Sequence, residues 1–569
     1  VINRTQKLIK KKNKDFNIED INFEDQKVFE LLSSGNTVGL FQVESAGMRE
    51  ALMQMKPNHI EDIIALVALY RPGPMSNIPV YNDCKHGRQT PDYLHPLLED
   101  ILKPTYGVII YQEQVMQIAQ KLSGFTAGEA DILRRAMGKK KRAELEKQKQ
   151  GFIAGALKNG ISKDVAASIF LKIEPFAEYG FNKSHAAAYA IISYQTAFLK
   201  TYYPKEFFAA SMTMDISNQN KLSEFHEELK RININVVRPD INKCYADFKF
   251  DEENFYYALG GIKSVGFDAI SNVVKERLTN GEFKSINDFL NRVNPKDINK
   301  LQLEGLVKAG AFDNIEKNRQ ALFNSIPNFI LKTKNIHENK AANQIDLFGA
   351  DEEQDNEIIL NMEDWKFEDR LSREFEAVGF FISDHPLNQF KEIFDDYKIV
   401  DYIKFNSDDN IKDANIAATL LKISERKTAK GNSYGVIKFT DLTSVFELFI
   451  FSDILELNRE ILIEGNSLII TLIKTISNDE NKLKRINVQK IASLKDLFNK
   501  PVSEIAFNIK TVDDIEKISK LLNEEGTTEV KINLETNDNN ISFKLKNRRL
   551  IDRKAINLLR KDDISVIIQ

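Results

Sequence analysis

Apolar residues recur at helical spacing over most of the first 330 positions of this chain. Between Tyr111 and Ala119, for example, they fall three and four positions apart, as on one face of an amphipathic helix. Little of the stretch between residues 20 and 330 alternates strictly between apolar and polar side chains, as a half-buried strand would. The pattern therefore predicts that this part of the chain is mostly α-helical.

Polar and acidic residues dominate the next stretch. Residues Lys332 to Asn343 are mostly polar, and residues Asp351 to Glu357 are mostly acidic. Segments with so few core-forming side chains do not bury enough apolar surface to fold on their own. We therefore expect a mobile linker here, and the clearest domain boundary of the chain.

Strand-like patterns follow the linker. From Ala414 to Leu494 the chain has short alternating runs, such as 434–439 and 447–451, with turn residues at 430–432. Residues 500–569 combine Ile- and Asn-rich strands with a helix over Asp513 to Leu522. The whole chain is therefore predicted to be multidomain, with a mostly α-helical part, a small β-barrel and a C-terminal α/β piece.

Composition narrows the class of protein. A length of 569 residues, 42% of them hydrophobic, fits three or four globular domains. The formal net charge of -4 excludes an evenly basic nucleic-acid coat, so any site for a polyanion must be a local patch. Two cysteines and seven scattered histidines fit neither a disulfide framework nor a zinc site.

The longest apolar run and the N-terminus indicate the location of the protein and the extent of the chain. The longest apolar run, Ile63 to Tyr70, is far shorter than the roughly 20 residues that cross a bilayer. We therefore expect a cytoplasmic protein without a membrane partner. Because the sequence begins at Val1 and enters a basic helical stretch directly, we expect it to be cut from a longer chain; removal of an initiator methionine is the alternative.

A basic cluster follows the first candidate motif. Thr126 and Glu129 have the spacing of a capping box, so a helix is predicted to begin there and to end at Gly138. Arg134 and Arg135 fall in its last turn, and adjacent guanidinium groups suit a triphosphate or a nucleic-acid backbone. A solvated helix end is the alternative. Four further cations complete the cluster: Lys139, Lys140, Lys141 and Arg142.

The second candidate motif precedes another helix. Residues 179–185 lead into an apolar helix predicted over Ala186 to Phe198, with Ser184 as its N-cap. This would place Lys183 and His185 beside free backbone N–H groups, which together form an anion site. An ordinary capped helix with a hydrogen-bonded histidine is the alternative.

Five segments, taken in order, make the chain similar to a known family. They resemble the fingers region of the bacterial DNA polymerase III alpha subunit, and the resemblance extends almost to the end, weakening after about residue 500. The segments are GLFQVESAGMR (39–49), ALVALYRPGP (65–74), PTYGVIIYQEQVMQIAQ (104–120), LRRAMGKKK (133–141) and YGFNKSHAAAYA (179–190).

The resemblance implies a role for both candidate motifs. It implies that Arg134 and Arg135 hold the triphosphate of an incoming deoxynucleotide, with Lys183 and His185 as further contacts. Polymerase chemistry also requires carboxylates that hold two Mg²⁺ ions, and in this family two of them form an Asp-x-Asp pair on the palm. The 569 residues contain no Asp-x-Asp. We therefore expect the metal ligands outside this chain, no catalytic residue within it, and no polymerisation by the chain alone.

Two later segments resemble DNA- and clamp-binding elements of the same family. Gly261, Lys263 and Gly266 lie in a turn before a predicted helix, as in a helix-hairpin-helix element whose backbone amides meet a DNA phosphate. Residues 344–348 resemble a peptide that binds the beta sliding clamp. In that peptide Gln344 would bond at the rim of the clamp pocket, Leu347 and Phe348 would fill its hydrophobic cleft, and Asp346 would be a further contact. A residue pair folded back onto a neighbouring domain is the alternative.

The predicted barrel fits an OB fold, whose grooves pair aromatic faces with cations to bind single-stranded DNA. Its candidate DNA contacts are Arg426, Lys427, Lys430 and Tyr434. A barrel that only packs, with solvated lysines, is the alternative. The resemblance implies further partners: primer-template DNA, the clamp-loader tau subunit at the end piece and a proofreading exonuclease subunit.

The family comparison also gives domain limits and leaves rival functions open. The predicted domains are fingers at 1–225, helix-hairpin-helix region at 226–331, linker and clamp motif at 332–413, OB fold at 414–495 and tau-binding piece at 496–569. The rival functions are a non-catalytic scaffold that binds DNA and clamp, and an error-prone relative of the replicative polymerase.

Overall fold

The computed structural model describes the 569-residue chain apart from several short gaps and one longer one. The gaps are 139–141, 342–358, 429–430, 432, 477–483, 500–501, 510, 512, 523, 536–539, 552–555, 557–558, 560–563 and 569. The described residues form two compact units. The first consists of Val1–Ile216, Glu228–Val236 and Phe248–Phe255, and the second of Ser217–Glu227, Val237–Asp247 and Tyr256–Gln569.

The first unit is helical, as the spacing of apolar residues predicted. Its helices are α1 (Ile2–Ile9), α2 (Gln26–Ser33), α3 (Ala46–Met55), α4 (Ile60–Leu69), α5 (Ile78–Lys85), α6 (Glu99–Leu102), α7 (Gln112–Ser123), α8 (Ala127–Gly138), α9 (Arg142–Lys158), α10 (Lys163–Tyr179), α11 (Lys183–Tyr202) and α12 (Pro204–Met214). After α12 come α13 (Gln219–Arg231) and three short strands in the order β1-β3-β2: β1 (Asn235–Val237), β3 (Asn254–Tyr256) and β2 (Lys249–Phe250).

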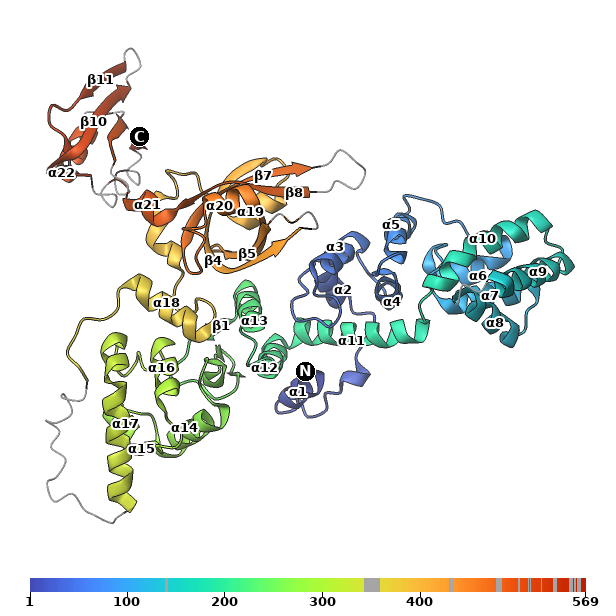
Figure 1. Cartoon of the computed structure of the whole chain (residues 1–569), viewed down its shortest axis with the longest axis horizontal. Helices are drawn as coiled ribbons and strands as arrows, with labels where there is room; N and C mark the ends of the chain where they lie inside the picture. The colour runs from blue at the N-terminus through green and yellow to red at the C-terminus, as the bar shows by residue number, and fades with distance from the viewer. Residues whose placement is uncertain are drawn as a thin grey trace. The chain divides into compact units, whose positions relative to one another are not determined.

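Helices α7 to α10 pack around a core of their own (Figure 1). Val115, Leu133 and Phe170 are among its fully buried members, one from each of α7, α8 and α10. Gly155 lets α9 approach the end of α7, because a Cβ atom there would lie 2.1 Å from the carbonyl oxygen of Ser123. This packing fixes α8, which carries the predicted arginine pair.

The second unit begins with the helix-hairpin-helix region and ends with two sheets. Its helices before the barrel are α14 (Phe267–Asn280), α15 (Ile286–Arg292), α16 (Lys300–Lys308), α17 (Arg319–Ala341), α18 (Phe367–Val378) and α19 (Tyr402–Ser407), with 3₁₀ turns η5 (Leu259–Gly261) and η7 (Pro386–Ile393). The predicted linker is wrong at its start, since α17 continues through residues 332–341. Polar residues there extend a helix whose earlier turns, with Leu322 and Phe329 buried, pack against α16.

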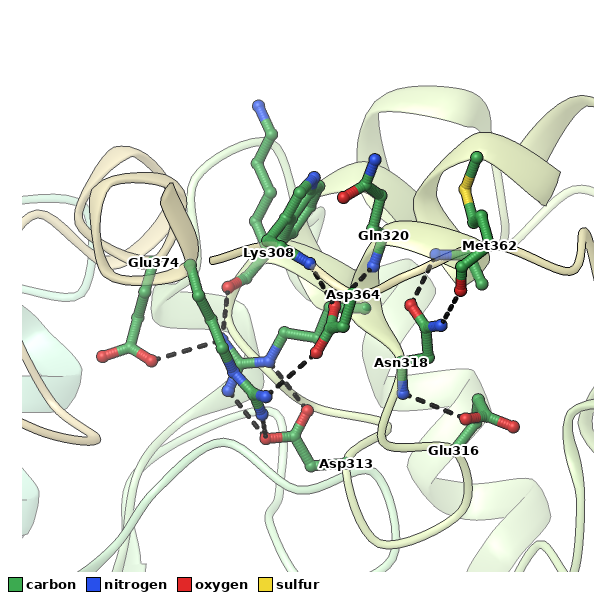
Figure 2. Close-up of polar contacts among 12 residues, drawn as sticks. Lys308, Asp313, Glu316, Asn318, Gln320, Met362, Asp364 and Glu374 are labelled. Atoms are coloured by element: carbon green, nitrogen blue, oxygen red, sulfur yellow. Dashed lines mark hydrogen bonds and ion pairs between the residues drawn. The ribbon is translucent and has the colours of Figure 1, made fainter. Parts of the chain in front are cut away.

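The chain returns to α17 after the longest gap. Asn318 donates from its side chain to the carbonyl oxygen of Met362 at 2.6 Å, and the N–H of Gln320 donates to the carboxylate of Asp364 at 3.0 Å (Figure 2). Further along α17, the hydroxyl of Ser325 accepts from the N–H of Leu360 at 2.9 Å. Residues 359–366 therefore belong to the same folded region as α17.

A buried arginine joins this region to α18. Arg319 is 1% exposed, and its guanidinium donates to Asp313 at 2.7 and 2.8 Å, to the carbonyl oxygen of Lys308 and to Glu374. Glu374 is fully buried and also accepts the N–H groups of residues 382 and 383. Figure 2 shows Lys308, Asp313 and Glu374 around this centre.

The predicted barrel is a five-stranded antiparallel sheet in the order β6-β5-β4-β7-β8. Its elements are β4 (Asp413–Lys427), β5 (Ser433–Thr440), β6 (Val445–Phe451), α20 (Ser452–Leu457), β7 (Ser467–Ile476) and β8 (Lys484–Ser493). β4 pairs with β7 through residues 413–419 and with β5 through residues 419–427, and its register with β5 shifts between Leu420 and Lys422. A bulge of this kind bends a strand, and the strand order with a helix after the third strand is that of an OB-type barrel.

The C-terminal piece has a four-stranded sheet in the order β11-β10-β9-β12. Its elements are β9 (Glu504–Ile509), α22 (Asp513–Leu521), β10 (Glu525–Glu535), β11 (Asn540–Lys544) and β12 (Ser565–Ile568). The preceding helix, α21 (Leu494–Asn499), packs instead against η7, β7 and β8. β9 and β10 are parallel and joined by α22, which confirms the predicted helix and the α/β class.

Candidate nucleotide and nucleic-acid sites

The arginine pair lies on α8, where the predicted capping box is present. The hydroxyl of Thr126 accepts the N–H of Glu129 at 3.3 Å, and the Glu129 carboxylate accepts the N–H of Thr126 at 2.8 Å. Arg134 and Arg135 both bond to one carboxylate, that of Asp131, at 2.7 Å each. Asp131 thus holds the two guanidinium groups side by side, and hydrogen bonding from Arg134 lowers the pKa of its carboxyl.

Exposure differs within this pair. The side chain of Arg134 is 27% exposed and that of Arg135 is 65% exposed, so both present N–H groups to solvent. The three lysines predicted to extend the cluster, Lys139, Lys140 and Lys141, lie outside the described residues. The described part of the cluster is therefore a pair of adjacent guanidinium groups on one helix.

The start of α7 connects α8 with the start of α11. Gln112 accepts a long hydrogen bond of 3.4 Å from Arg134, and its own N–H donates to the carbonyl oxygen of Phe181 at 3.0 Å. Next to it, Glu113 accepts the N–H of Lys183 with both carboxylate oxygens, at 3.1 and 3.0 Å. Two motifs that are far apart in the sequence are thus brought to the same short segment.

The prediction for the start of α11 was partly wrong. The helix begins at Lys183, and its N-cap is Asn182 rather than Ser184, because the Asn182 side chain accepts the N–H of His185 at 2.9 Å. Lys183 and His185 were expected to lie beside free backbone N–H groups, yet at this helix start the N–H groups of both residues donate to side chains, those of Glu113 and Asn182. An anion at the first N–H group of the helix would have to displace the Glu113 carboxylate.

The side chains of this second motif lie among aromatic rings. The ammonium group of Lys183 bonds to Glu61 at 3.2 Å and lies 5.4 Å from the centroid of the Tyr111 ring. The Tyr111 ring is buried, which raises the pKa of its hydroxyl. His185 is exposed, and its ring centroid is 5.5 Å from that of Phe181.

The helix-hairpin-helix turn has the predicted form. Gly266 is the N-cap residue of α14. Because glycine has no side chain, no N-cap side chain accepts the first N–H groups of this 14-residue helix. Lys263 is exposed, while its backbone N–H donates to the carbonyl oxygen of Ala377 at 2.8 Å. Gly261, predicted as a DNA contact, is instead buried within the 3₁₀ turn, and its carbonyl oxygen accepts a hydrogen bond from the Gln219 side chain at 2.9 Å. Gly261 therefore supports the turn from inside, and Lys263 lies on its surface.

On the barrel, the predicted contacts form part of a larger outer face. Arg426 lies opposite Tyr434 in the ladder, and Tyr434 lies opposite Phe451 on the next strand. Sequence analysis missed Phe449 and Phe451, which are 54% and 58% exposed. The alternation of β6 was the available signal, because buried residues at 446, 448 and 450 leave those at 449 and 451 outside. We call Arg426, Tyr434, Phe449 and Phe451 the barrel face.

Most of the remaining predicted contacts lie outside the described residues. Lys427 is exposed next to this face, while Lys430 lies outside the described residues. The clamp motif also lies outside them, with all four of its predicted contacts: Gln344, Asp346, Leu347 and Phe348. Within the described part of the chain, no three His, Cys, Asp or Glu side chains gather as a metal site, and no helix is long and apolar enough to span a membrane.

Comparison with known proteins gives a consistent result. Residues 1–160 match the bacterial DNA polymerase III alpha subunit finger domain, and residues 233–322 match a helix-hairpin-helix motif. DNA polymerase III subunit alpha of Caulobacter vibrioides is 42% identical over 472 residues, which are 83% of this chain and 41% of that protein. The subunit alpha of Rickettsia bellii is 40% identical over 551 residues, 92% of this chain and 47% of that protein.

The chain matches only part of the length of each relative. The Borreliella burgdorferi subunit alpha, at 39% identity, is also covered over only 44% of its length. The chain thus spans somewhat less than half the length of the relatives it matches. It belongs to the family of bacterial DNA polymerase III alpha subunits.

Proposed function

We propose that this chain is the nucleotide- and DNA-binding part of a replicative DNA polymerase, a nucleotidyltransferase that extends a primer with deoxynucleoside triphosphates. The observation that carries the proposal is the arginine pair on α8. Both guanidinium groups bond to the carboxylate of Asp131, and the pair lies within the residues that match a finger domain. Guanidinium groups match phosphate oxygens in charge and in fork geometry.

In this proposal Arg134 and Arg135 bind the triphosphate, with Lys183 and His185 at its edge. Asp131 orders both guanidinium groups before the nucleotide arrives, and a phosphate then takes the N–H groups that face solvent. We expect Mg²⁺ to be held by carboxylates outside this chain, and the chain alone to be unable to extend a primer.

DNA contacts belong to the second unit in this proposal. The turn at Lys263 and Gly266 suits the backbone of a duplex, since the start of α14 has no N-cap side chain and the exposed side chain of Lys263 is a cation, both of which favour phosphate. The barrel face suits single-stranded DNA, because exposed rings stack on bases and Arg426 neutralises charge. The sliding clamp, bound through residues 344–348, and the tau and exonuclease subunits are proposed partners that rest on the family resemblance.

The test of the proposed function uses the subunit at the full length of its relatives. Replacing Arg134 or Arg135 by lysine keeps the positive charge but removes the planar guanidinium, which can donate two parallel hydrogen bonds to a phosphate. We therefore expect the KM for the nucleotide to rise by about tenfold or more. Lys172→Ala is the control, since this exposed lysine in the same helical group pairs with Asp92. A nucleotide KM within twofold of the parent enzyme in both arginine variants contradicts the assignment.

A further inference from the structure

A cleft of about 750 Å³ lies within the second unit, between α18 and the barrel. One wall is a single face of α18, because the lining residues recur along the helix at spacings of three and four: Glu368, Leu371, Ser372, Phe375 and Glu376. The other wall consists of residues 461–467, which precede and begin β7, and of the start of α21. We call this feature the α18 cleft. Its volume is typical of pockets that hold a ligand.

The floor of the α18 cleft is apolar. Leu371, Phe381 and Phe390 line it and are otherwise buried in two small hydrophobic clusters. Phe375 and Ile461 also line it, and both are half-buried, so part of each side chain faces the cleft. An apolar side chain placed here would remove these surfaces from water, which favours binding.

The rim of the α18 cleft is acidic. Five carboxylates line it against two ammonium groups, those of Lys263 and Lys495. The five carboxylates belong to Glu368, Asp369, Glu376, Glu464 and Asp496. Within the described part of the chain, Asp369, Glu464 and Asp496 form no ion pair. The cleft therefore carries an excess of negative charge.

The surroundings of Lys495 show this excess directly. Its ammonium group bonds to the carboxylate of Glu368 at 2.7 Å. This hydrogen bond and the charge of Glu368 raise the pKa of Lys495, and the charges of Asp369 and Asp496 act in the same direction. One ammonium group is thus shared among three carboxylates, so a second cation would be attracted to the same end of the cleft.

An apolar floor below an acidic rim favours a ligand that is both apolar and cationic, and it disfavours nucleic acid and acidic peptides. The wall from Glu368 to Glu376 is about 12 Å long, because a helix rises about 1.5 Å per residue. About four residues of extended chain span that distance, with successive side chains on opposite sides. Such a segment can place apolar side chains on the floor and basic ones at the rim.

We propose that the α18 cleft binds a short extended segment of a partner protein, in which lysine or arginine residues flank an aromatic or aliphatic side chain. The proposal goes beyond the proposed function and does not rest on it. The turn at Lys263 forms one end of the cleft, and the N–H of Lys263 bonds to Ala377 of α18. The partner is therefore held next to the turn that is proposed to contact duplex DNA.

The first experiment selects ligands for the 569-residue chain from a phage-displayed library of random peptides, at about 0.15 M salt to screen unspecific attraction. Peptides that also bind the Ser372→Trp variant are removed, because the indole fills the cleft from an exposed position of α18. We expect the remaining peptides to be enriched in lysine and arginine around an aromatic or aliphatic residue. An empty pool, or one with no more basic residues than the library, overturns the proposal.

The second experiment measures the Kd of the most frequent remaining peptide, labelled with fluorescein, by fluorescence anisotropy. The test variant combines Asp369→Asn, Glu464→Gln and Asp496→Asn, which remove three charges and keep the shape of the rim. We expect its Kd to rise about tenfold or more, because complementary charge is lost. The matched control combines Glu363→Gln, Asp395→Asn and Glu524→Gln, three exposed acids of the same unit outside the cleft.

The control changes the net charge by the same amount, so we expect its Kd to change less than twofold. An equal rise in both triple variants means that only overall charge matters and overturns the proposal. Thermal melting checks that each variant, including Ser372→Trp, is folded.

Two other occupants of the cleft give different results. If a second copy of the chain fills it, sedimentation velocity shows a dimer that Ser372→Trp dissociates. If nucleic acid fills it, an unlabelled oligothymidylate displaces the peptide. Either result overturns the proposal. Because no nucleotide or primer extension enters these measurements, their outcome is independent of the KM measured for the arginine variants.

Discussion

Replacing Arg319 by methionine tests how the helix-hairpin-helix region is stabilised. Methionine fills similar space but removes four hydrogen bonds, at 2.8 and 2.7 Å to Asp313, 3.1 Å to Lys308 and 3.3 Å to Glu374. Asp313 keeps a second partner, Arg370, whereas Glu374 is fully buried and loses its cation. Removing one member of a buried ion pair costs about 3–5 kcal/mol.

The single tryptophan of the chain provides a local assay. Trp365 lies in this region, 5.5 Å from the ring of Phe323 and 4.5 Å from the guanidinium of Arg373. Its fluorescence therefore follows unfolding of this region in urea, although the whole chain will not unfold in one step. With a slope of about 2 kcal/mol per M, the loss at Arg319 corresponds to a fall of about 2 M in the midpoint.

Two further variants make the reasoning refutable. Arg370→Met removes bonds to the same Asp313 and to Asp364 from a side chain that is 31% exposed, so we expect a loss of at most about 1 kcal/mol. Adding Glu374→Gln to Arg319→Met removes the unpaired charge and should recover part of the midpoint, since one oxygen still accepts two N–H groups. A midpoint for Arg319→Met no lower than for Arg370→Met refutes the argument.

Two other outcomes are expected. Burial lowers the pKa of Lys200 from 10.5 to about 8, so between these values the unfolded chain holds a proton that the folded chain has released. The free energy of unfolding of the first unit should therefore rise with pH across this window, and thermal melting of Lys200→Met should show no such rise; an equal rise in the variant contradicts this. For the proposed clamp motif, Gln344→Ala with Phe348→Ala should abolish binding to the sliding clamp in surface plasmon resonance, and unchanged affinity dismisses the motif.

Local patterns in the sequence were sufficient to predict the elements whose formation depends on residues close together in the chain. The capping box at Thr126 and Glu129 predicted the start of α8, because both partners lie within one helical turn. The alternation of 434–439 and 447–451 predicted two strands of the barrel for the same reason. The helical class of the first unit likewise followed from spacing alone.

Tertiary contacts decided the features that the sequence left open. Asn182 and Ser184 are both good N-cap residues, and pairing of Phe181 with Tyr111 extends the chain up to residue 181, so Asn182 forms the cap. Lys332 to Ala341 has a polar composition, yet it continues a helix that is anchored by its earlier turns. The contacts of Asp131 with both arginines could have been noticed from their spacing of three and four residues.

The strand order of the barrel also determines how it folds. β4, β5 and β6 follow one another in the chain and pair as neighbours, so little entropy is lost in closing the loops between them. β7 pairs instead with Asp413 to Thr419 in the first half of β4, from which it is separated by two strands and α20. Pairing across a long loop slows folding. The three-strand meander should therefore form first, and docking of the β7–β8 hairpin should set the rate at which the barrel closes.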